Sequence, residues 1–441
     1  MRRGRNRPRP AGNRHTGAQL KPTTGRSARV ATAITMLSLG ALAGCGSGAA
    51  TSPGGGTVIT MALDIPVSAD AYVAGAIQRG ADTAVKEINA RGLTIGGVAR
   101  TVALRVYDDN AQPALSAQNV SSAIADGAVA VIEDGLGAAT SAPRGAAAGV
   151  PEIDVANGTA TLMDPAGRPS LFRLGIANDA AANRLGTYIA QSIQSVAVIH
   201  DDSDSGRDGA TQLAMALATA GARADPTIEV PADSATFDAQ LQAVGAAHPG
   251  GLVIWGSDLF VAKLVSSAHA ANLGLPLFAG PTAESPAVRA TAGNAATDGL
   301  RFVSSRLTSE ADPTSFGQFE HRLAAREGGP TDAGFTDAEG RRIRQPNDFD
   351  FFSYDAVNLV VAALKKQGSA AAGQPLIAAI GSVSVPSANG DTRGFNPQNH
   401  EGVADDDMYI AIIHDMKFAP VQDEQLSKTL PTEDQVLADF G

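Results

Sequence analysis

Short apolar runs alternate with amphipathic stretches along the chain from residue 57 onward. Most of the apolar runs are rich in β-branched residues. Several are apolar throughout, as expected for strands that are buried on both faces of a sheet. The pattern predicts strands at residues 57–63, 101–107, 128–132, 150–155, 195–200, 251–255, 276–279 and 299–304.

The stretches between these runs predict helices, because their apolar residues fall at helical spacing and leave one apolar face. Asp258 can cap a helix, and Gly221 and Gly274 can end helices. The predicted helices cover residues 72–91, 111–126, 178–194, 208–220, 237–247, 258–273, 315–326 and 351–367. Alternating strands and helices predict an α/β fold with parallel sheets, and the number of units is better divided between two lobes than placed in one sheet.

Two later segments lack this alternation. Residues 327–348 are polar and rich in Gly and Pro, which predicts a long surface loop. Residues 416–441 are polar and predict a loosely attached tail.

The N-terminal residues 1–44 have the pattern of an export signal. Nine Lys and Arg residues and no acidic residue are followed by an apolar stretch at 30–43. This stretch is about 15 residues long, shorter than the roughly 20 that an α-helix needs to cross a bilayer. We therefore expect residues 1–44 to be a signal peptide that is removed after export.

The sequence around Cys45 resembles a bacterial lipobox, since Leu42, Ala43 and Gly44 precede this cysteine, which is the only one in the chain. The resemblance implies that Cys45 is lipidated and becomes the first residue of the mature protein. Residues 45–56 are rich in Gly and Ser and would form a flexible tether to the membrane. The alternative is an ordinary signal peptide that carries a cysteine by chance.

The charge of the mature chain excludes some partners. Removing residues 1–44 leaves 25 basic against 45 acidic residues, a formal charge of −20. So acidic a surface disfavours nucleic acid and anionic lipid as partners. The remaining 397 residues predict two domains.

The segment 135–140, Gly-Leu-Gly-Ala-Ala-Thr, follows a predicted strand and precedes a helix. Ligands of open α/β sheets bind at such strand ends, and glycines allow a ligand to approach the backbone. The segment also matches part of a dinucleotide-binding motif, with Asp154 as a possible ribose ligand, but its third glycine is missing. A tight turn without a ligand is the remaining interpretation.

A second polar cluster occupies residues 200–206. Asp202 and Asp204 suggest calcium, but the spacing to Gly206 does not fit a calcium loop and no Glu closes it. The acids are therefore expected to be solvated, or to contact the ammonium group of a ligand.

Catalytic and metal-binding motifs are absent from the sequence, so we expect neither an enzyme nor a cofactor. The histidines are dispersed, and Trp255, which ends a predicted buried strand, is better explained by core packing than by ligand stacking.

Eight segments in one order resemble the leucine/isoleucine/valine-binding protein family of type I periplasmic binding proteins. They are AYVAGAIQRGADTAVKEINARG, VALRVYDDNAQPALSAQNV, VAVIEDGLGAATSAPRGAAAGVP, LFRLGIANDAAAN, VAVIHDDSDSGRDGA, FFSYDAVNLVVAALKK, GFNPQNHEGV and MYIAIIHDMKFAPV. The resemblance covers residues 57–422. It implies two Rossmann-like lobes joined by three crossovers, with residues 57–176 and 304–382 in lobe 1 and residues 177–303 and 383–415 in lobe 2.

The resemblance also implies that a solute is held between the lobes and trapped by hinge closure. The positions that it assigns to the binding site are Tyr72, Gly137, Ala138, Thr140, Asn157, Gly158, Thr159, Asp179, Ser205, Ser257 and Thr282.

Several of these positions depart from the family pattern. Gly137 replaces a Ser that helps to hold the solute carboxylate. Ser205 and Ser257 stand where Tyr is frequent, and Thr282 stands where an acid often binds the ammonium group. We therefore expect a small polar solute that is not necessarily leucine, isoleucine or valine.

The resemblance favours a monomeric, lipid-anchored receptor that delivers an amino acid or another small polar solute to the ABC permease of an importer. A lipoprotein that senses a ligand for a membrane signalling partner, or an exported enzyme that uses the same cleft, is the alternative.

Overall fold

The computed structural model describes residues 57–305, 313–324, 335–336, 338–343, 345–388 and 392–423, together with positions 435 and 438. The predicted signal peptide, Cys45 and the predicted tether therefore lie outside the described residues.

The first lobe is built on a six-stranded sheet in the order β2-β3-β1-β4-β5-β6. Its strands are β1 (Thr57–Ile65), β2 (Leu93–Ile95), β3 (Val98–Asp108), β4 (Val131–Glu133), β5 (Glu152–Asp154) and β6 (Leu171–Arg173). All neighbours are parallel except β2 and β3, which form a hairpin. The helices of this part are α1 (Ala71–Arg91), α2 (Pro113–Ala125), α3 (Ala138–Ala148) and the short η1 (Ala160–Leu162).

The second lobe is built on a seven-stranded sheet in the order β17-β16-β11-β10-β9-β7-β8. Its strands are β7 (Ser195–Asp201), β8 (Arg223–Val230), β9 (Leu252–Trp255), β10 (Leu277–Ala279), β11 (Arg301–Ser305), β16 (Met408–His414) and β17 (Lys417–Pro420). The accompanying helices are α4 (Asn178–Ala190), α5 (Asp204–Thr219), α6 (Asp238–Ala247), α7 (Asp258–Ala271), η2 (Pro281–Glu284), α8 (Pro286–Ala292) and α9 (Asn294–Thr297).

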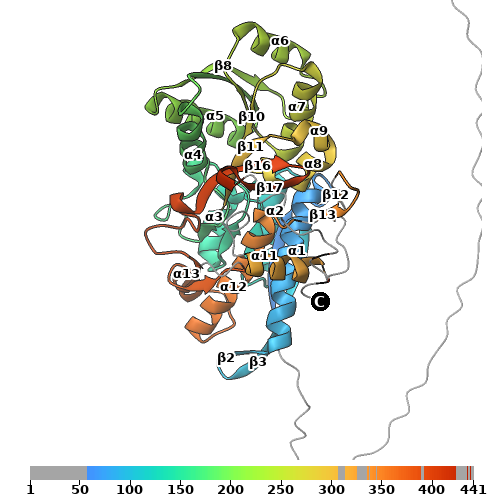
Figure 1. Ribbon diagram of the computed structural model, residues 1–441. Helices are drawn as coiled ribbons and strands as arrows, with labels where there is room; N and C mark the ends of the chain where they lie inside the picture. The colour runs from blue at the N-terminus through green and yellow to red at the C-terminus, as the bar shows by residue number, and fades with distance from the viewer. Residues whose placement is uncertain are drawn as a thin grey trace, which may run out of the picture. The chain divides into compact units, whose positions relative to one another are not determined.

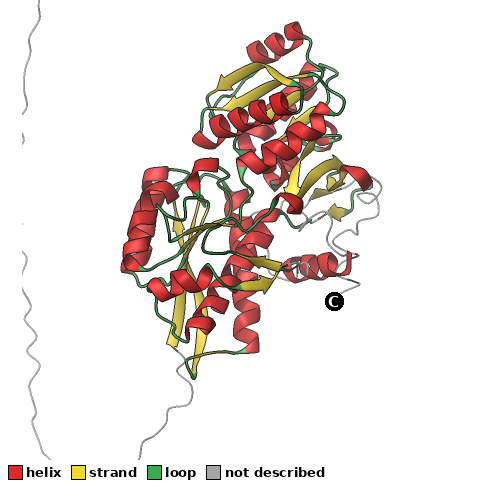
Figure 2. Ribbon diagram, turned by 90° about the vertical axis from the view of Figure 1, so that its left-hand side faces the viewer, coloured by secondary structure: helices red, strands yellow, loops and turns green. Residues whose placement is uncertain are grey.

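Later segments return to the first lobe, where α12 packs against α1, and α13 and β14 pack against α12. These segments are α11 (Pro313–Ala324), α12 (Asp348–Gln367), α13 (Gln374–Ile380) and the hairpin of β14 (Ser384–Pro386) with β15 (Thr392–Gly394). The hairpin of β12 (Phe335–Thr336) with β13 (Arg342–Ile343) lies against the second lobe, where Ile343 packs with Met416. The short helices η3 (Asp405–Asp407) and η4 (Val421–Asp423) flank the last two strands. Figure 1 shows α4 to α9 at one end and α1, α12 and α13 at the other, and Figure 2 shows each group of strands flanked by helices.

The chain passes between the lobes three times. The first crossover (residues 174–177) joins β6 to α4, the second (306–347) joins β11 to α12, and the third (395–407) joins β15 to β16. The architecture is thus the predicted α/β fold of two lobes, and all eight predicted strands are confirmed.

Three expectations need correction. Helix α5 begins at Asp204 rather than at residue 208, because the Ser203 hydroxyl accepts a hydrogen bond from the Gly206 N–H and caps the helix there. The second sheet continues through β17, past the predicted start of the tail at residue 416. The predicted surface loop ends in buried residues, since Gln345 exchanges two hydrogen bonds with the Phe418 backbone; much of the loop itself lies outside the described residues.

Within the two large sheets, strands β2, β6, β8, β16 and β17 were not predicted. Strand β8 is at the sheet edge and has alternating exposure, and β6 has only three residues, so neither has the long apolar run of a central strand.

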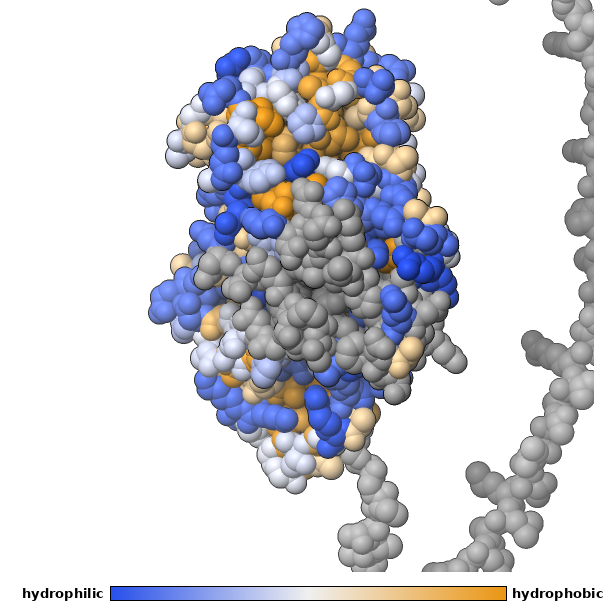
Figure 3. Space-filling view, viewed as in Figure 1, coloured by the Kyte–Doolittle hydropathy of each residue, from blue (hydrophilic) through white to orange (hydrophobic). Residues whose placement is uncertain are grey.

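Trp255 is 3% exposed and packs in the core at the end of β9, as expected. Its indole requires a glycine on the facing helix, because a Cβ at Gly209 in α5 would lie 2.0 Å from the Trp255 Nε1. The face in Figure 3 carries many hydrophilic residues, together with apolar patches on the upper part of the molecule. No helix in the described part of the chain is both long enough and apolar enough to span a bilayer.

Candidate functional site

The loop between β4 and α3 carries the first group of predicted site residues. Gly137 is the N-cap of α3, and its N–H donates to the Ser116 Oγ at 3.1 Å. A Cβ at this position would lie 2.5 Å from the Ala117 N, so glycine is required by packing against α2. Ala138 is buried, whereas Thr140 is exposed on the first turn of the helix. The Ser of the family pattern is therefore excluded here by the close approach of α2.

The loop after β5 carries the second group. The Asp154 carboxylate accepts hydrogen bonds from the N–H groups of Ala156 and Asn157, and the Asn157 side chain donates to the Gly135 carbonyl. The Asn157 Oδ1 in turn accepts from the N–H and the hydroxyl of Thr159. These bonds tie the 156–159 loop to the loop after β4.

Predicted residues of the second lobe lie at the ends of β7, β9 and β10. Asp201 is buried at the end of β7 and accepts hydrogen bonds from the Ser203 hydroxyl and from the Ser257 N–H. The Thr282 hydroxyl donates to the Gly256 carbonyl at 2.7 Å. Asp201 thus brings the loop of Ser257 next to the start of α5, where Ser205 lies.

Asn178 connects the two lobes. Its N–H donates to the Gly158 carbonyl at 2.6 Å, and its side chain donates to the Ser205 hydroxyl and to Asp208 on α5. The Asp208 carboxylate also accepts from the Ala160 N–H at 2.8 Å. The predicted residues Gly158, Thr159 and Ser205 are therefore brought together by Asn178 and Asp208, which the sequence pattern did not single out.

A second connection lies at the start of α1. Asp70 caps this helix by accepting from the N–H groups of Tyr72 and Val73, and its side chain is hydrogen-bonded to that of Asp258 at the start of α7. Burial, and after it the charge of Asp70, raises the pKa of Asp258 well above its ordinary range. Tyr72 is half-buried beside this pair.

The sheet of the first lobe carries a row of buried ionisable side chains next to the site. Asp64, Glu133, Asp154 and Arg173 are paired in register across β1, β4, β5 and β6, which places them on one face of the sheet. Glu152, two residues before Asp154, lies on the same face.

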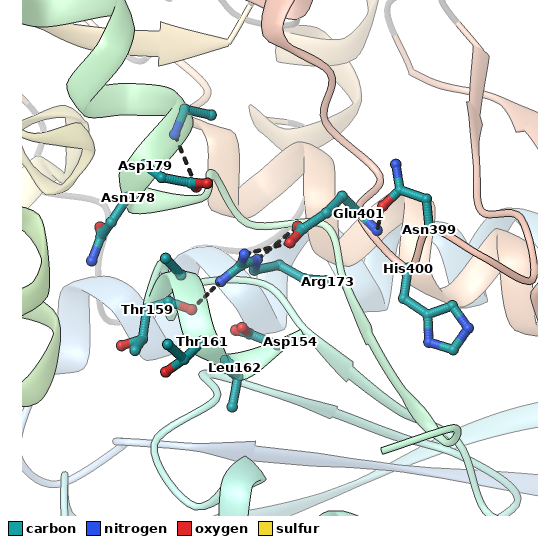
Figure 4. A network of polar contacts seen from close by, with 12 residues as sticks. Asp154, Thr159, Thr161, Leu162, Arg173, Asn178, Asp179, Asn399, His400 and Glu401 are labelled. Carbon is teal, nitrogen blue, oxygen red and sulfur yellow. Dashed lines mark hydrogen bonds and ion pairs between the residues drawn. The ribbon is translucent and has the colours of Figure 1, made fainter. Parts of the chain in front are cut away.

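Burial dominates the electrostatics of this row. It raises the pKa of Asp64, Glu152 and Asp154 to about 7, and it raises the pKa of Glu133 well above its ordinary range, with neighbouring carboxyls adding to the shift at Glu133. Arg173 stands at the end of the row, and its charge partly offsets the effect on Asp154 (Figure 4). Burying such carboxyls lowers the stability of the fold unless they are protonated, paired or hydrogen-bonded.

The ribose-binding role considered for Asp154 is not compatible with this geometry, because its side chain is fully buried and caps its own loop. Among the described residues, no group of three or more His, Cys, Asp or Glu side chains is arranged to hold a metal ion. Asp202 and Asp204 are exposed, and Asp179 is exposed at the start of α4.

Sequence reasoning predicted several of the loops that the structure brings together, but it missed the side chains that join them. Asp70, Asn178, Asp208 and Arg173 are ordinary polar residues at helix starts or strand ends, and only Asp70, directly before a helix, has a local signal as a cap.

Comparisons with known proteins support the same fold. The family model described as periplasmic binding protein matches residues 62–417. A structure described as periplasmic binding protein type 1, from Bordetella pertussis Tohama I, has a TM-score of 0.71 at 21% identity and covers 82% of this chain and 100% of that chain. No curated protein matches the chain.

Several of the similar structures contain a ligand. The substrate-binding protein of a branched-chain amino acid transporter from Streptococcus pneumoniae, in complex with isoleucine, has a TM-score of 0.69 at 19% identity, covering 83% of this chain and 99% of that one. A solute-binding protein of an ABC transporter from R. palustris, in complex with benzoate, has a TM-score of 0.69 at 20% identity, covering 82% and 95%.

Proposed function

Because the chain belongs to the type I periplasmic binding protein family, we propose that it is the extracytoplasmic solute-binding component of an ABC importer. The observation that carries the proposal is the meeting of both lobes at the carboxyl ends of their strands, through Asn178, Asp208 and Ala160. A solute held at this junction contacts both lobes, which is the condition for closure driven by its binding.

We further propose that the solute is an amino acid or a similar small polar molecule. Helices α3, α4, α5 and α7 begin at the junction, and the N-terminal ends of helices favour an anionic group. Asp70 and Asp179 add carboxylates, which favour an ammonium group. A zwitterion has both an anionic group and an ammonium group and so fits both preferences. The ligands of two of the similar structures, isoleucine and benzoate, share only a carboxylate.

The same proposal gives the location of the protein in the cell. Cys45 carries the lipid, residues 45–56 form the tether, and the lobes act as a monomer at the outer face of the cell membrane, next to the permease. The lipobox pattern and the signal-like residues 1–44 support this arrangement. Mass spectrometry of the intact protein from membranes tests it, since lipidation adds an acyl mass at Cys45 and Cys45→Ser removes it.

A thermal-unfolding screen tests the solute class. Amino acids, benzoate as an anion without ammonium, and simple amines are each added to the purified protein. A true solute at about 100 times its Kd stabilises the folded state by roughly 2.7 kcal/mol. We expect amino acids or other zwitterions to raise the Tm, and branched-chain amino acids not to be the best of them.

Native mass spectrometry of protein purified without denaturation complements the screen, because it detects a solute retained from the cell. A protein that retains nothing and is stabilised by no metabolite in a broad panel contradicts the proposed function.

A further inference from the structure

Arg173 lies where two crossovers leave the first lobe together. The Arg173 N–H donates to the His400 carbonyl at 2.9 Å, and the Gly402 N–H donates to the Arg173 carbonyl at 2.7 Å. The first and third crossovers therefore run side by side at this residue. The two segments approach closely here, because a Cβ at Gly402 would lie 2.5 Å from the Leu174 Cδ2.

The beginning of the third crossover is fixed to the first lobe by packing. The His400 ring stacks on Phe172 at 4.1 Å and its Nδ1 is 2.7 Å from the Leu171 carbonyl. Phe395 contacts the other side of this cluster, with its ring 5.0 Å from Phe172. Beyond these residues, Arg184 on α4 donates to the Asp405 carbonyl, so the far end of the third crossover contacts the second lobe. The change from first-lobe to second-lobe contacts therefore falls just after Arg173 and Glu401, which is where a hinge between the lobes is expected.

The Arg173 side chain links this hinge to the 156–159 loop. Its Nε and Nη2 bind both oxygens of Glu401 at 2.8 and 2.5 Å, and its Nη1 donates to the carbonyls of Asn157 and Thr159 at 3.0 and 2.9 Å (Figure 4). Arg173 is fully buried, and the Glu401 side chain is 25% exposed. A planar guanidinium can make all four contacts at once, which an ammonium group cannot.

We propose that Arg173 is a positioning residue that, with Glu401, fixes the 156–159 loop to the third crossover and so sets its place at hinge closure. This inference rests on the proposed solute-binding function, because it assigns the loop to the solute site. When the lobes close, the crossovers move. The Arg173 guanidinium transmits this movement to the carbonyls of Asn157 and Thr159, and the Glu401 carboxylate balances its charge.

Hydrogen exchange measures the coupling without a ligand. The N–H groups of Asn157, Thr159 and Ala160 are all hydrogen-bonded, so their exchange reports the opening of the loop. In the full chain, we expect Arg173→Lys and Glu401→Gln each to raise exchange at these amides by about tenfold.

Arg393 and Asp407 provide a matched control. Arg393 is 1% exposed, and its Nη1 donates to Asp407 at 2.8 Å and to the Gly402 carbonyl at 3.0 Å, both within the third crossover. Arg393→Lys and Asp407→Asn alter a buried ion pair of the same kind, and we expect exchange at residues 157–160 to stay at the wild-type rate. Unchanged exchange in the Arg173 and Glu401 variants, or an equal rise in the control variants, overturns the proposal.

The second measurement is the affinity for a solute. The probes are L-isoleucine, benzoate and the solute retained in native mass spectrometry. We expect Arg173→Lys to weaken the binding of whichever probe binds by about tenfold, with Arg393→Lys close to wild type. Equal affinities in the two variants overturn the proposal. If neither these probes nor any metabolite of the thermal-unfolding panel binds, the proposed function fails, whereas the exchange result still decides the role of Arg173.

Discussion

Glu133 shows how the first lobe tolerates charge in its core. It lies at the end of β4 with no exposed surface, and neither of its carboxyl oxygens has a hydrogen-bond partner among the residues that the structure describes. A buried polar group without a partner costs about 1–3 kcal/mol. The neighbouring carboxyls of Glu152 and Asp64 make an ionised Glu133 more costly still.

Replacing Glu133 by an apolar residue of similar length should therefore stabilise the protein. We expect Glu133→Met to raise the free energy of unfolding by about 1–3 kcal/mol, measured by urea unfolding with circular dichroism. Glu133→Gln is the control, because it keeps a polar group in the same place and should gain little. A Met variant less stable than wild type would show that Glu133 has a partner, such as a buried water molecule.

The raised pKa values of the row predict a pH dependence of stability. Asp154 has an ordinary pKa of 3.8 and a folded pKa of about 7, so the folded state binds its proton more tightly than the unfolded state. The stabilisation is complete below pH 3.8 and is lost as the pH rises through about 7. One such carboxyl makes the free energy of unfolding roughly 3 kcal/mol smaller at neutral pH than near pH 4.

The Asp154→Asn variant isolates this contribution, because an amide oxygen can still accept from the N–H groups of Ala156 and Asn157. We expect its free energy of unfolding to fall less steeply than that of wild type between about pH 4 and about pH 7, in urea titrations at several pH values. Parallel profiles for the two proteins would mean that Asp154 is not protonated in the folded state.

At the level of elements, the contact between α5 and β9 depends on one glycine. The Trp255 indole fills the space beside Gly209, where an added Cβ would lie 2.0 Å from the Trp255 Nε1. Helix α5 also carries Ser205 and Asp208, so a shift of this helix moves the second-lobe side of the site.

Gly209→Ala should consequently destabilise the protein by about 1–3 kcal/mol, because the core has no room for the methyl group. The fluorescence of Trp255, the only tryptophan, should change in the same variant. Gly245→Ala in α6 is the matched control. Its Cβ would lie 3.6 Å from the Leu273 side chain, an ordinary contact, and alanine favours a helix by about 0.5–1 kcal/mol over glycine. Equal stability changes in the two variants would contradict the packing argument.

At the level of the whole molecule, two pairs of carboxyls link the lobes. Asp70 is hydrogen-bonded to Asp258, and the Glu284 side chain in η2 accepts from the Asp348 N–H and is hydrogen-bonded to the Asp348 side chain. A carboxyl and a carboxylate can share a proton, but two carboxylates repel each other, by about 1–4 kcal/mol at close range.

Raising the pH should therefore separate the lobes in the absence of solute. Asp258 has a raised pKa, so it holds its proton at low pH and loses it as the pH rises through that value. We expect the radius of gyration from X-ray scattering to increase with pH in wild type and to change less in Asp258→Asn, whose amide keeps a donor for Asp70. Gly245→Ala, far from the lobe contact, serves as the control. A radius that is independent of pH would show that this pair does not hold the lobes.

The apolar periodicity of the sequence by itself determined the α/β class, eight of the strands and most of the helices. The order of eight sequence segments indicated the family by resemblance. These features depend on residues close together in the chain. The local pattern also predicted the loops of the candidate site, because strand ends followed by helix starts are visible in the sequence.

Only the tertiary structure decided which side chains meet. Asp64, Glu133, Asp154 and Arg173 come from four strands, and the register between parallel strands is set by packing rather than by any local signal. The same holds for the contact of Arg173 with Glu401, which are far apart in sequence. Long-range contacts of this kind arise only when both lobes have folded. This is why the sequence could predict the loops of the candidate site, whereas only the structure showed which side chains join them.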